Sequence, residues 1–102
     1  MSTVVQITQQ EFDQVISSGT KKVLVDCYAE WCGPCKMMMP VLESIEDKID
    51  IIKVNIDEHE DLAKEYRIMS IPTLVFFKDG EIQEELVGFR SKEELEEIID
   101  KY

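Results

Sequence analysis

The sequence predicts an α/β domain in which helices lie on the faces of a mixed β-sheet. Two observations predict this class. Segments rich in strand-forming residues alternate with segments whose apolar residues recur at helical spacing, as in strands joined by helical crossovers. Further along, two strand-like segments flank Asp79-Gly80, a dipeptide typical of tight hairpins, so the last two strands are expected to be antiparallel.

The first expected elements are a strand at residues 4–7 and a helix that ends at Gly19. Thr8 and Glu11 have the spacing of a capping box at the start of that helix. Residues 22–29 are nearly continuously apolar, which is typical of a strand covered on both faces. These segments predict a strand, a helix and a buried central strand, in that order.

A second helix is expected to begin at Gly33 or Pro34, because proline is favoured in the first turn of a helix. It runs to about Lys48 and contains Pro40, which should kink it. Residues 49–56 form the third strand. Since helical crossovers join the first three strands, we expect these strands to be parallel.

Asp57 is expected to cap a third helix that carries Leu62, Ala63 and Tyr66, and a loop follows it over residues 67–72. The hairpin strands span residues 73–78 and 81–87. A last helix begins with a second capping box and has one apolar stripe, formed by Leu95, Ile98, Ile99 and Tyr102.

Length and composition restrict the class of protein. The 102 residues suit one domain, over residues 1–102, and 44% of them are hydrophobic. Acidic residues outnumber basic ones by 22 to 11, which argues against nucleic acid or an anionic membrane as a partner. No apolar segment approaches the ~20 residues that span a bilayer, and no targeting segment is recognisable, so a cytoplasmic protein is expected.

The chemistry of the chain is expected at Cys32 and Cys35, which are separated by two residues at the start of the second helix. Residues i and i+3 share a helix face, so the two sulfurs can meet. Free backbone N–H groups at the helix start stabilise a thiolate on Cys32. We therefore expect Cys32 to be the exposed nucleophile and Cys35 the more buried resolving cysteine.

A zinc site is the alternative interpretation of two close cysteines. Zinc needs four ligands, and the chain offers only Cys27 and His59 beside the pair. No metal is therefore expected, although a site shared between two chains stays open. Cys27 should point to the opposite sheet face from Asp26 because side chains alternate along a strand, and it is expected to pack in the core.

The surrounding sequence resembles the thioredoxin family over nearly the whole chain. The motifs that carry the resemblance are WCGPCK at 31–36, K-V-N-I-D at 53–57, S-I-P-T at 70–73 and F-K-D-G at 77–80, followed by Gly88. The resemblance implies a central five-stranded mixed sheet with four helices. It also implies a protein disulfide reductase that uses a Cys32–Cys35 disulfide and needs no bound cofactor.

The resemblance assigns further site residues. Asp26 would transfer a proton to or from Cys35 through water, since burial raises the pKa of a carboxyl group; a solvated or structurally paired aspartate is the alternative. Lys53 would pair with Asp26 or extend to solvent. Pro72 would be cis, although the residues alone favour trans, and the backbone before it would bind an extended client.

An apolar rim around Cys32 is expected to bind clients, and the resemblance places in it Trp31, Gly33, Pro34, Ile71, Pro72, Gly88 and Phe89. Trp31 could instead belong to the core. Gly33-Pro34 puts no charge beside Cys32, which is similar to the reducing members of the family. The chain departs from the family at Cys27 and Tyr28, where bulky aromatic residues are common, and the Tyr28 exchange could change packing and redox poise near the site.

The implied partners are thioredoxin reductase as electron donor and disulfide-containing clients such as ribonucleotide reductase, peroxiredoxins and methionine sulfoxide reductases. A monomer is expected. Two other functions compete with this one: a docking module in which exchange is incidental, and an oxidant or isomerase in an oxidising compartment. The intact Cys-Gly-Pro-Cys argues against the first, and Gly33-Pro34 argues against the second.

Overall fold

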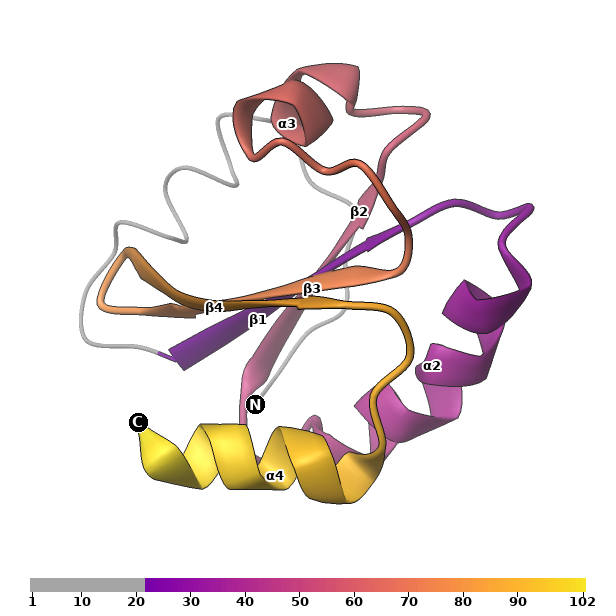
Figure 1. Cartoon of the computed structure of the whole chain (residues 1–102). Coiled ribbons are helices and arrows are strands. Elements are labelled where there is room, and N and C mark those ends of the chain that lie inside the picture. The colour runs from indigo at the N-terminus through magenta and orange to yellow at the C-terminus, as the bar shows by residue number, and fades with distance from the viewer. Residues whose placement is uncertain (1–21) are drawn as a thin grey trace.

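A computed structural model describes residues 22–102, which form a four-stranded mixed sheet with helices on both faces (Figure 1). The strands are arranged in the order β2-β1-β3-β4. Their bounds are β1 Lys22–Tyr28, β2 Asp50–Asn55, β3 Thr73–Lys78 and β4 Glu81–Val87. The expected strand at 4–7 and the helix that ends at Gly19 lie outside the described residues, so four strands and three helices are described where five and four were expected.

Strand directions in the described sheet agree with the sequence. β1 pairs with β2 in parallel, as a helical crossover requires, and with β3 in antiparallel. β3 and β4 form the predicted antiparallel hairpin. Asp79 and Gly80 both have positive φ at its turn, which explains why this dipeptide is suited to the position.

The three described helices are α2 (Gly33–Ile45), α3 (Glu60–Glu65) and α4 (Lys92–Lys101). In Figure 1, α2 and α4 lie on one side of the sheet and α3 lies on the other. The core under α2 and α4 is formed by Leu24, Met38, Leu42, Ile45, Ile49, Ile51, Leu74, Phe76, Leu86, Leu95 and Ile99. The core toward α3 is formed by Val23, Val25, Cys27, Ile52, Val54, Leu62, Val75 and Phe77.

Two helix boundaries differ from the predicted ones. α2 ends at Ile45 instead of Lys48, and Lys48 N–H donates to the Ile45 carbonyl in a turn beyond the helix. Asp57 does not cap α3, which begins three residues later, at Glu60, with His59 at the N-cap. The Asp57 carboxylate instead accepts a hydrogen bond from Trp31, so a tertiary contact uses the side chain that the sequence assigned to the cap.

α4 is fixed to the sheet at its C-terminal end. Lys22 Nζ on β1 donates to the Ile99 carbonyl over 2.7 Å, and Lys78 Nζ on β3 donates to Tyr102 O over 2.7 Å. These two lysines are paired across the β1–β3 ladder, so they reach the helix side by side. The carbonyl end of a helix carries partial negative charge, which the two ammonium groups neutralise. Within residues 22–102, no helix is long and apolar enough to cross a membrane.

Candidate active site

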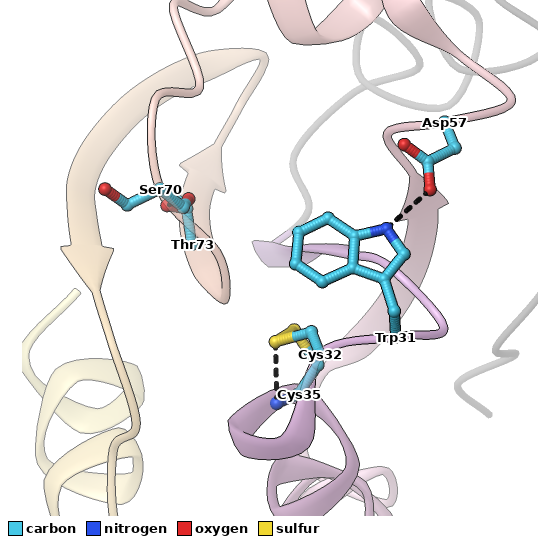
Figure 2. The surroundings of a disulfide bond; sticks show 6 residues. All are labelled: Trp31, Cys32, Cys35, Asp57, Ser70 and Thr73. Atoms are coloured by element: carbon cyan, nitrogen blue, oxygen red, sulfur yellow. Dashed lines mark hydrogen bonds between the residues drawn. A yellow bond between two sulfur atoms is a disulfide. The ribbon is translucent and has the colours of Figure 1, made fainter.

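The candidate site begins at the loop after β1, which places Cys32 at the N-cap of α2. The backbone of Cys32 is extended, and its Sγ accepts a hydrogen bond from the Cys35 N–H over 3.2 Å (Figure 2). A disulfide joins Cys32 to Cys35, whose Cα atoms are 5.2 Å apart. The reacting sulfur therefore occupies the position that a capping oxygen has in other helices, where positive backbone charge stabilises a thiolate.

Both cysteines are buried, so the expectation of an exposed Cys32 is wrong for this disulfide form. The exposed fraction is 5% for Cys32 and 3% for Cys35. They pack with Ala29 in a small apolar cluster that is also contacted by Tyr28, Ile56 and Ile71. Sequence reasoning placed Cys32 at the helix start correctly but had no way to place Ile71, 39 residues later, against it.

The two residues between the cysteines shape the helix start without adding charge. Pro34 lies in the first turn, as predicted, where its missing N–H removes no helical hydrogen bond. A Cβ placed on Gly33 would have no atom within 4 Å, so the backbone there is open on its outer side. Gly33 and Pro34 therefore add no charge between the two cysteines, and Gly33 adds no bulk.

Asp26 lies in the middle of β1 and is fully buried. Its neighbour Leu24, two residues earlier, packs under α2, so Asp26 is directed to the same face. Neither carboxylate oxygen has a hydrogen-bond partner within the described part of the chain. Burial raises the pKa of Asp26 to about 6, although Lys53 opposes the rise. Burial excludes the alternative of a solvated aspartate, and no hydrogen bond from the described residues supports a structurally paired one. The group titrates near neutral pH.

Lys53 lies directly across from Asp26 in the β1–β2 ladder. Its ammonium lies over the ring of Tyr28, with Nζ 4.6 Å from the ring centroid. This distance is typical of a cation–π contact. The two predicted alternatives were an ion pair with Asp26 and extension to solvent. The structure shows a third arrangement, in which Lys53 is half-buried and acts on Asp26 without a hydrogen bond.

Trp31 is 70% exposed, which agrees with a surface role beside the cysteines. Its indole Nε1 donates to Asp57 Oδ2 over 2.9 Å, and Figure 2 shows the ring held between that carboxylate and the disulfide. Sequence reasoning missed Asp57 as a site residue. One signal could have found it: Asp57 follows β2 and Trp31 follows β1, and parallel neighbouring strands end at the same edge of the sheet.

The loop before β3 faces the cysteine pair. The Ile71–Pro72 peptide bond is cis, as the resemblance implied, and Ile71 packs against the cysteine cluster. Thr73 Oγ1 donates to the Ser70 carbonyl over 2.5 Å, which closes the loop that Figure 2 shows opposite Trp31. Gly88 N–H donates to the Pro72 carbonyl over 2.8 Å, so the ends of two loops are joined at this point.

Cys27 lies away from this site. It is a free, buried thiol in the core toward α3, on the opposite sheet face from Asp26, as alternation predicted. Burial raises its pKa to about 12, and the charges of Asp26 and Glu85 add to the rise. A thiol with this pKa is neutral at physiological pH and reacts slowly as a nucleophile.

Exposed apolar side chains are present near the cysteine pair and on the segments that surround it. Besides Trp31, the exposed large hydrophobic residues include Met37, Met69, Val87 and Phe89. Met38 is buried between Met37 and Met39, which are both exposed, as expected for consecutive residues on a helix. Among residues 22–102, no group of three or more histidine, cysteine, aspartate or glutamate side chains is placed to hold a metal ion.

Comparison with known proteins identifies the group to which these features belong. The family model described as Thioredoxin matches residues 3–101. A thioredoxin from Staphylococcus epidermidis is 50% identical, with 97% of each chain covered. A thioredoxin from Staphylococcus aureus is 48% identical at the same coverage.

Solved structures agree in fold. A mutant thioredoxin from Halobacterium salinarum NRC-1 superposes with a TM-score of 0.90 at 39% identity, covering 97% of this chain and 89% of that one. Mitochondrial thioredoxin 3 from Saccharomyces cerevisiae, in its oxidised form, has a TM-score of 0.86 at 35% identity, with coverage of 97% and 95%. The similarity therefore extends over at least 89% of each chain.

Proposed function

The chain belongs to the thioredoxin family of disulfide oxidoreductases, and we propose that it works as a reductant of disulfide bonds in other proteins. The observation that carries the proposal is the position of Cys32 Sγ, which is bonded to Cys35 and accepts the Cys35 N–H at the start of α2. This position favours the thiolate that attacks a client disulfide.

In the proposed reaction, the Cys32 thiolate attacks one sulfur of the client disulfide and displaces the other as a thiolate. Cys35 then attacks Cys32 Sγ in the mixed disulfide, which releases the second client sulfur and closes the Cys32–Cys35 bond. The client gains two electrons and the protein loses two, so the electron pair is carried by sulfur alone and no bound cofactor is needed.

Asp26 would serve the second step by accepting the Cys35 thiol proton through water. A general base works best when its pKa is near the working pH, and the pKa of about 6 for Asp26 meets this condition. The burial of Asp26 on the α2 side of β1 supports this role, because Cys35 lies in the first turn of that helix.

Client binding would use the rim around Cys32. Trp31 supplies an exposed ring, Ile71 and Pro72 supply the cis loop, and Gly88 is hydrogen-bonded to that loop. Gly33 and Pro34 add no charge between the two cysteines. An extended client segment would pair with the backbone before Pro72 by strand-like hydrogen bonds.

A thioredoxin reductase would return the electrons to the Cys32–Cys35 pair. Ribonucleotide reductase, peroxiredoxins and methionine sulfoxide reductases are the proposed clients. The proposed location is the cytoplasm, where thiols are kept reduced, and the proposed working form is a monomer.

The first test is the reduction potential of the Cys32–Cys35 couple, measured against glutathione by Trp31 fluorescence. A value below about −230 mV is expected for a reductant, and a value above about −200 mV would contradict the proposal in favour of an oxidant or isomerase. The Cys32→Ser and Cys35→Ser variants should lose client reduction in an insulin assay. Cys27→Ala is the matched control and should keep it, because Cys27 lies in the opposite core.

A further inference from the structure

The structure places an aromatic ring, an ammonium group and a buried carboxyl group next to one another on one face of the sheet. Asp26 and Tyr28 are two residues apart on β1, so their side chains lie on the same sheet face. Lys53 on β2 is the ladder partner of Asp26. Its Nζ nonetheless lies 4.6 Å from the centroid of the Tyr28 ring, and Asp26 has no hydrogen-bond partner in the described part of the chain.

We propose that Tyr28 is a positioning residue: its ring holds the Lys53 ammonium away from Asp26 and so prevents a hydrogen-bonded ion pair between the two. A direct ion pair would stabilise the ionised carboxylate. With the ammonium on the ring, Lys53 still attracts the carboxylate through space but makes no hydrogen bond to it. Asp26 can then bind and release a proton near neutral pH.

An open cavity of about 510 Å³ places this contact beside the reacting sulfurs. Tyr28 and Lys53 line it together with Cys35, and Ala29, Glu30, Lys36 and Met39 complete the lining. Tyr28 also packs against the Cys32–Cys35 cluster. The ring therefore contacts both the disulfide cluster and the cation that acts on Asp26.

Other charged groups border the same cavities as Lys53 and compete for its ammonium. Glu43 on α2 and Glu46, which follows its last residue, line a neighbouring cavity that Lys53 also borders. Glu30 and Lys36 border the larger cavity. On β3, the residue opposite Asp26 is Leu74, which is uncharged, so Lys53 is the cation that faces Asp26 from the neighbouring strands.

Tyr28→Leu is expected to lower the pKa of Asp26. Without the ring, the ammonium is expected to move onto the Asp26 carboxylate and lower the Asp26 pKa by about one unit or more, which is the usual effect of an opposite charge in contact. Tyr28→Phe keeps the ring face and should leave the pKa unchanged. Lys53→Met should raise it, since Lys53 is the group that lowers it in the native chain.

The experiment is an NMR titration of the Asp26 carboxyl carbon in the full oxidised chain, for the native protein and these variants. Removing a ring could also hydrate Asp26 and lower its pKa without any movement of Lys53. The double variant Tyr28→Leu/Lys53→Met separates the two causes. If the proposal holds, Tyr28→Leu lowers the pKa in the native background and has no effect in the Lys53→Met background.

Three results would overturn the inference: an unchanged or raised Asp26 pKa in Tyr28→Leu, an equal fall in both backgrounds, or a Tyr28→Phe value that follows Tyr28→Leu. A further measurement needs no variant. In the native protein the side-chain protons of Lys53 next to Nζ should be shifted upfield by the Tyr28 ring, and their absence from the ring's shielding region would also overturn it.

Any effect of Tyr28 on catalysis rests on the proposed proton role of Asp26. The positioning role of Tyr28 and the proton role of Asp26 can fail separately. If Asp26→Asn reduces clients at the native rate, the proton role fails, whereas the titration still decides whether Tyr28 positions Lys53. If both roles hold, Tyr28→Leu should move the pH midpoint of client reduction to lower pH, and Tyr28→Phe should keep the native midpoint.

Discussion

At the scale of single residues, Asp26 stands out because its carboxyl group, which is most stable in water, is buried in the core. Its carboxyl group is fully buried and has no hydrogen-bond partner among residues 22–102. Such a group destabilises a fold, and it does so more strongly when it is ionised than when it is protonated. Perturbed titratable groups of this kind concentrate at functional sites. The proton role proposed for Asp26 would explain why a carboxyl group is kept there at a cost in stability.

Replacing Asp26 by asparagine should slow client reduction by roughly tenfold or more at pH 7, because general acid–base catalysis contributes at least that much. The change in rate that follows ionisation of Asp26 near pH 6 should disappear as well. Steady-state reduction measured from pH 5 to 8 checks both effects. Asp100→Asn removes the same charge from an exposed position on α4 and should leave the profile unchanged; an identical profile for both variants would contradict the prediction.

Asp57 fixes the orientation of the indole of Trp31 through one hydrogen bond. Asp57→Ala should leave the ring at the surface but free to rotate, so the decay of Trp31 fluorescence anisotropy should become faster. The KM for a protein client should rise by about threefold to tenfold, as loss of a hydrogen bond of ~1 kcal/mol implies. Asp61→Ala, at an exposed position on α3, is the control, and equal anisotropy decays in the two variants would exclude the proposed role.

At the scale of elements, α4 depends on contacts at both ends. Ser91 Oγ accepts the Glu94 N–H, and Glu94 in return accepts the Ser91 N–H, so two free backbone donors are satisfied at the start of the helix. At the other end, Lys22 and Lys78 bind the last carbonyls. α4 covers one core of the sheet, so fraying at either end would expose that core.

Ser91→Ala should lower the free energy of unfolding by about 1 kcal/mol, because alanine cannot accept the Glu94 N–H. Urea unfolding followed by circular dichroism measures this change. Ser44→Ala is a suitable control, since the Ser44 hydroxyl donates to the Val41 carbonyl within α2 and caps no helix. If the two variants lose the same stability, the cap is not the cause.

Elements encoded by local sequence were predictable, and contacts between distant segments were not. Pro34 after Cys32 specifies the start of α2, and Asp79-Gly80 specifies the hairpin, because the necessary backbone angles depend on those residues alone. Asp57 was assigned to a helix cap because its partner, Trp31, lies 26 positions away in the chain. The burial of Cys32 under Ile71 and the contact of Lys53 with Tyr28 were missed for the same reason.

At the scale of the whole molecule, the raised pKa of Asp26 makes the stability of the fold depend on pH. Its pKa is about 6 in the folded chain against 3.8 in an unperturbed one, so ionisation is harder in the folded state. The folded state therefore loses stability relative to the unfolded state as pH rises from about 4 to about 6. The full effect is about 3 kcal/mol above that range.

The difference in unfolding free energy between Asp26→Asn and the native chain isolates this effect, because all other carboxylates titrate equally in both. The variant should gain stability relative to the native chain as pH rises from 4 to 7, by up to about 3 kcal/mol, and the difference should be constant above pH 7. Urea unfolding at each pH measures it. A difference that does not change with pH would mean that Asp26 ionises normally in the folded chain.

The capping of α2 by Cys32 has a consequence for how the redox state of the molecule can be observed. In the disulfide, the Cys35 amide donates to a neutral sulfur over 3.2 Å. After reduction the same amide faces a sulfur that can carry a full negative charge, and charge-assisted hydrogen bonds are stronger. Hydrogen–deuterium exchange at this one amide should therefore slow when the protein gains its two electrons. The exchange rate of this single backbone proton would then distinguish the reduced dithiol form from the oxidised disulfide form.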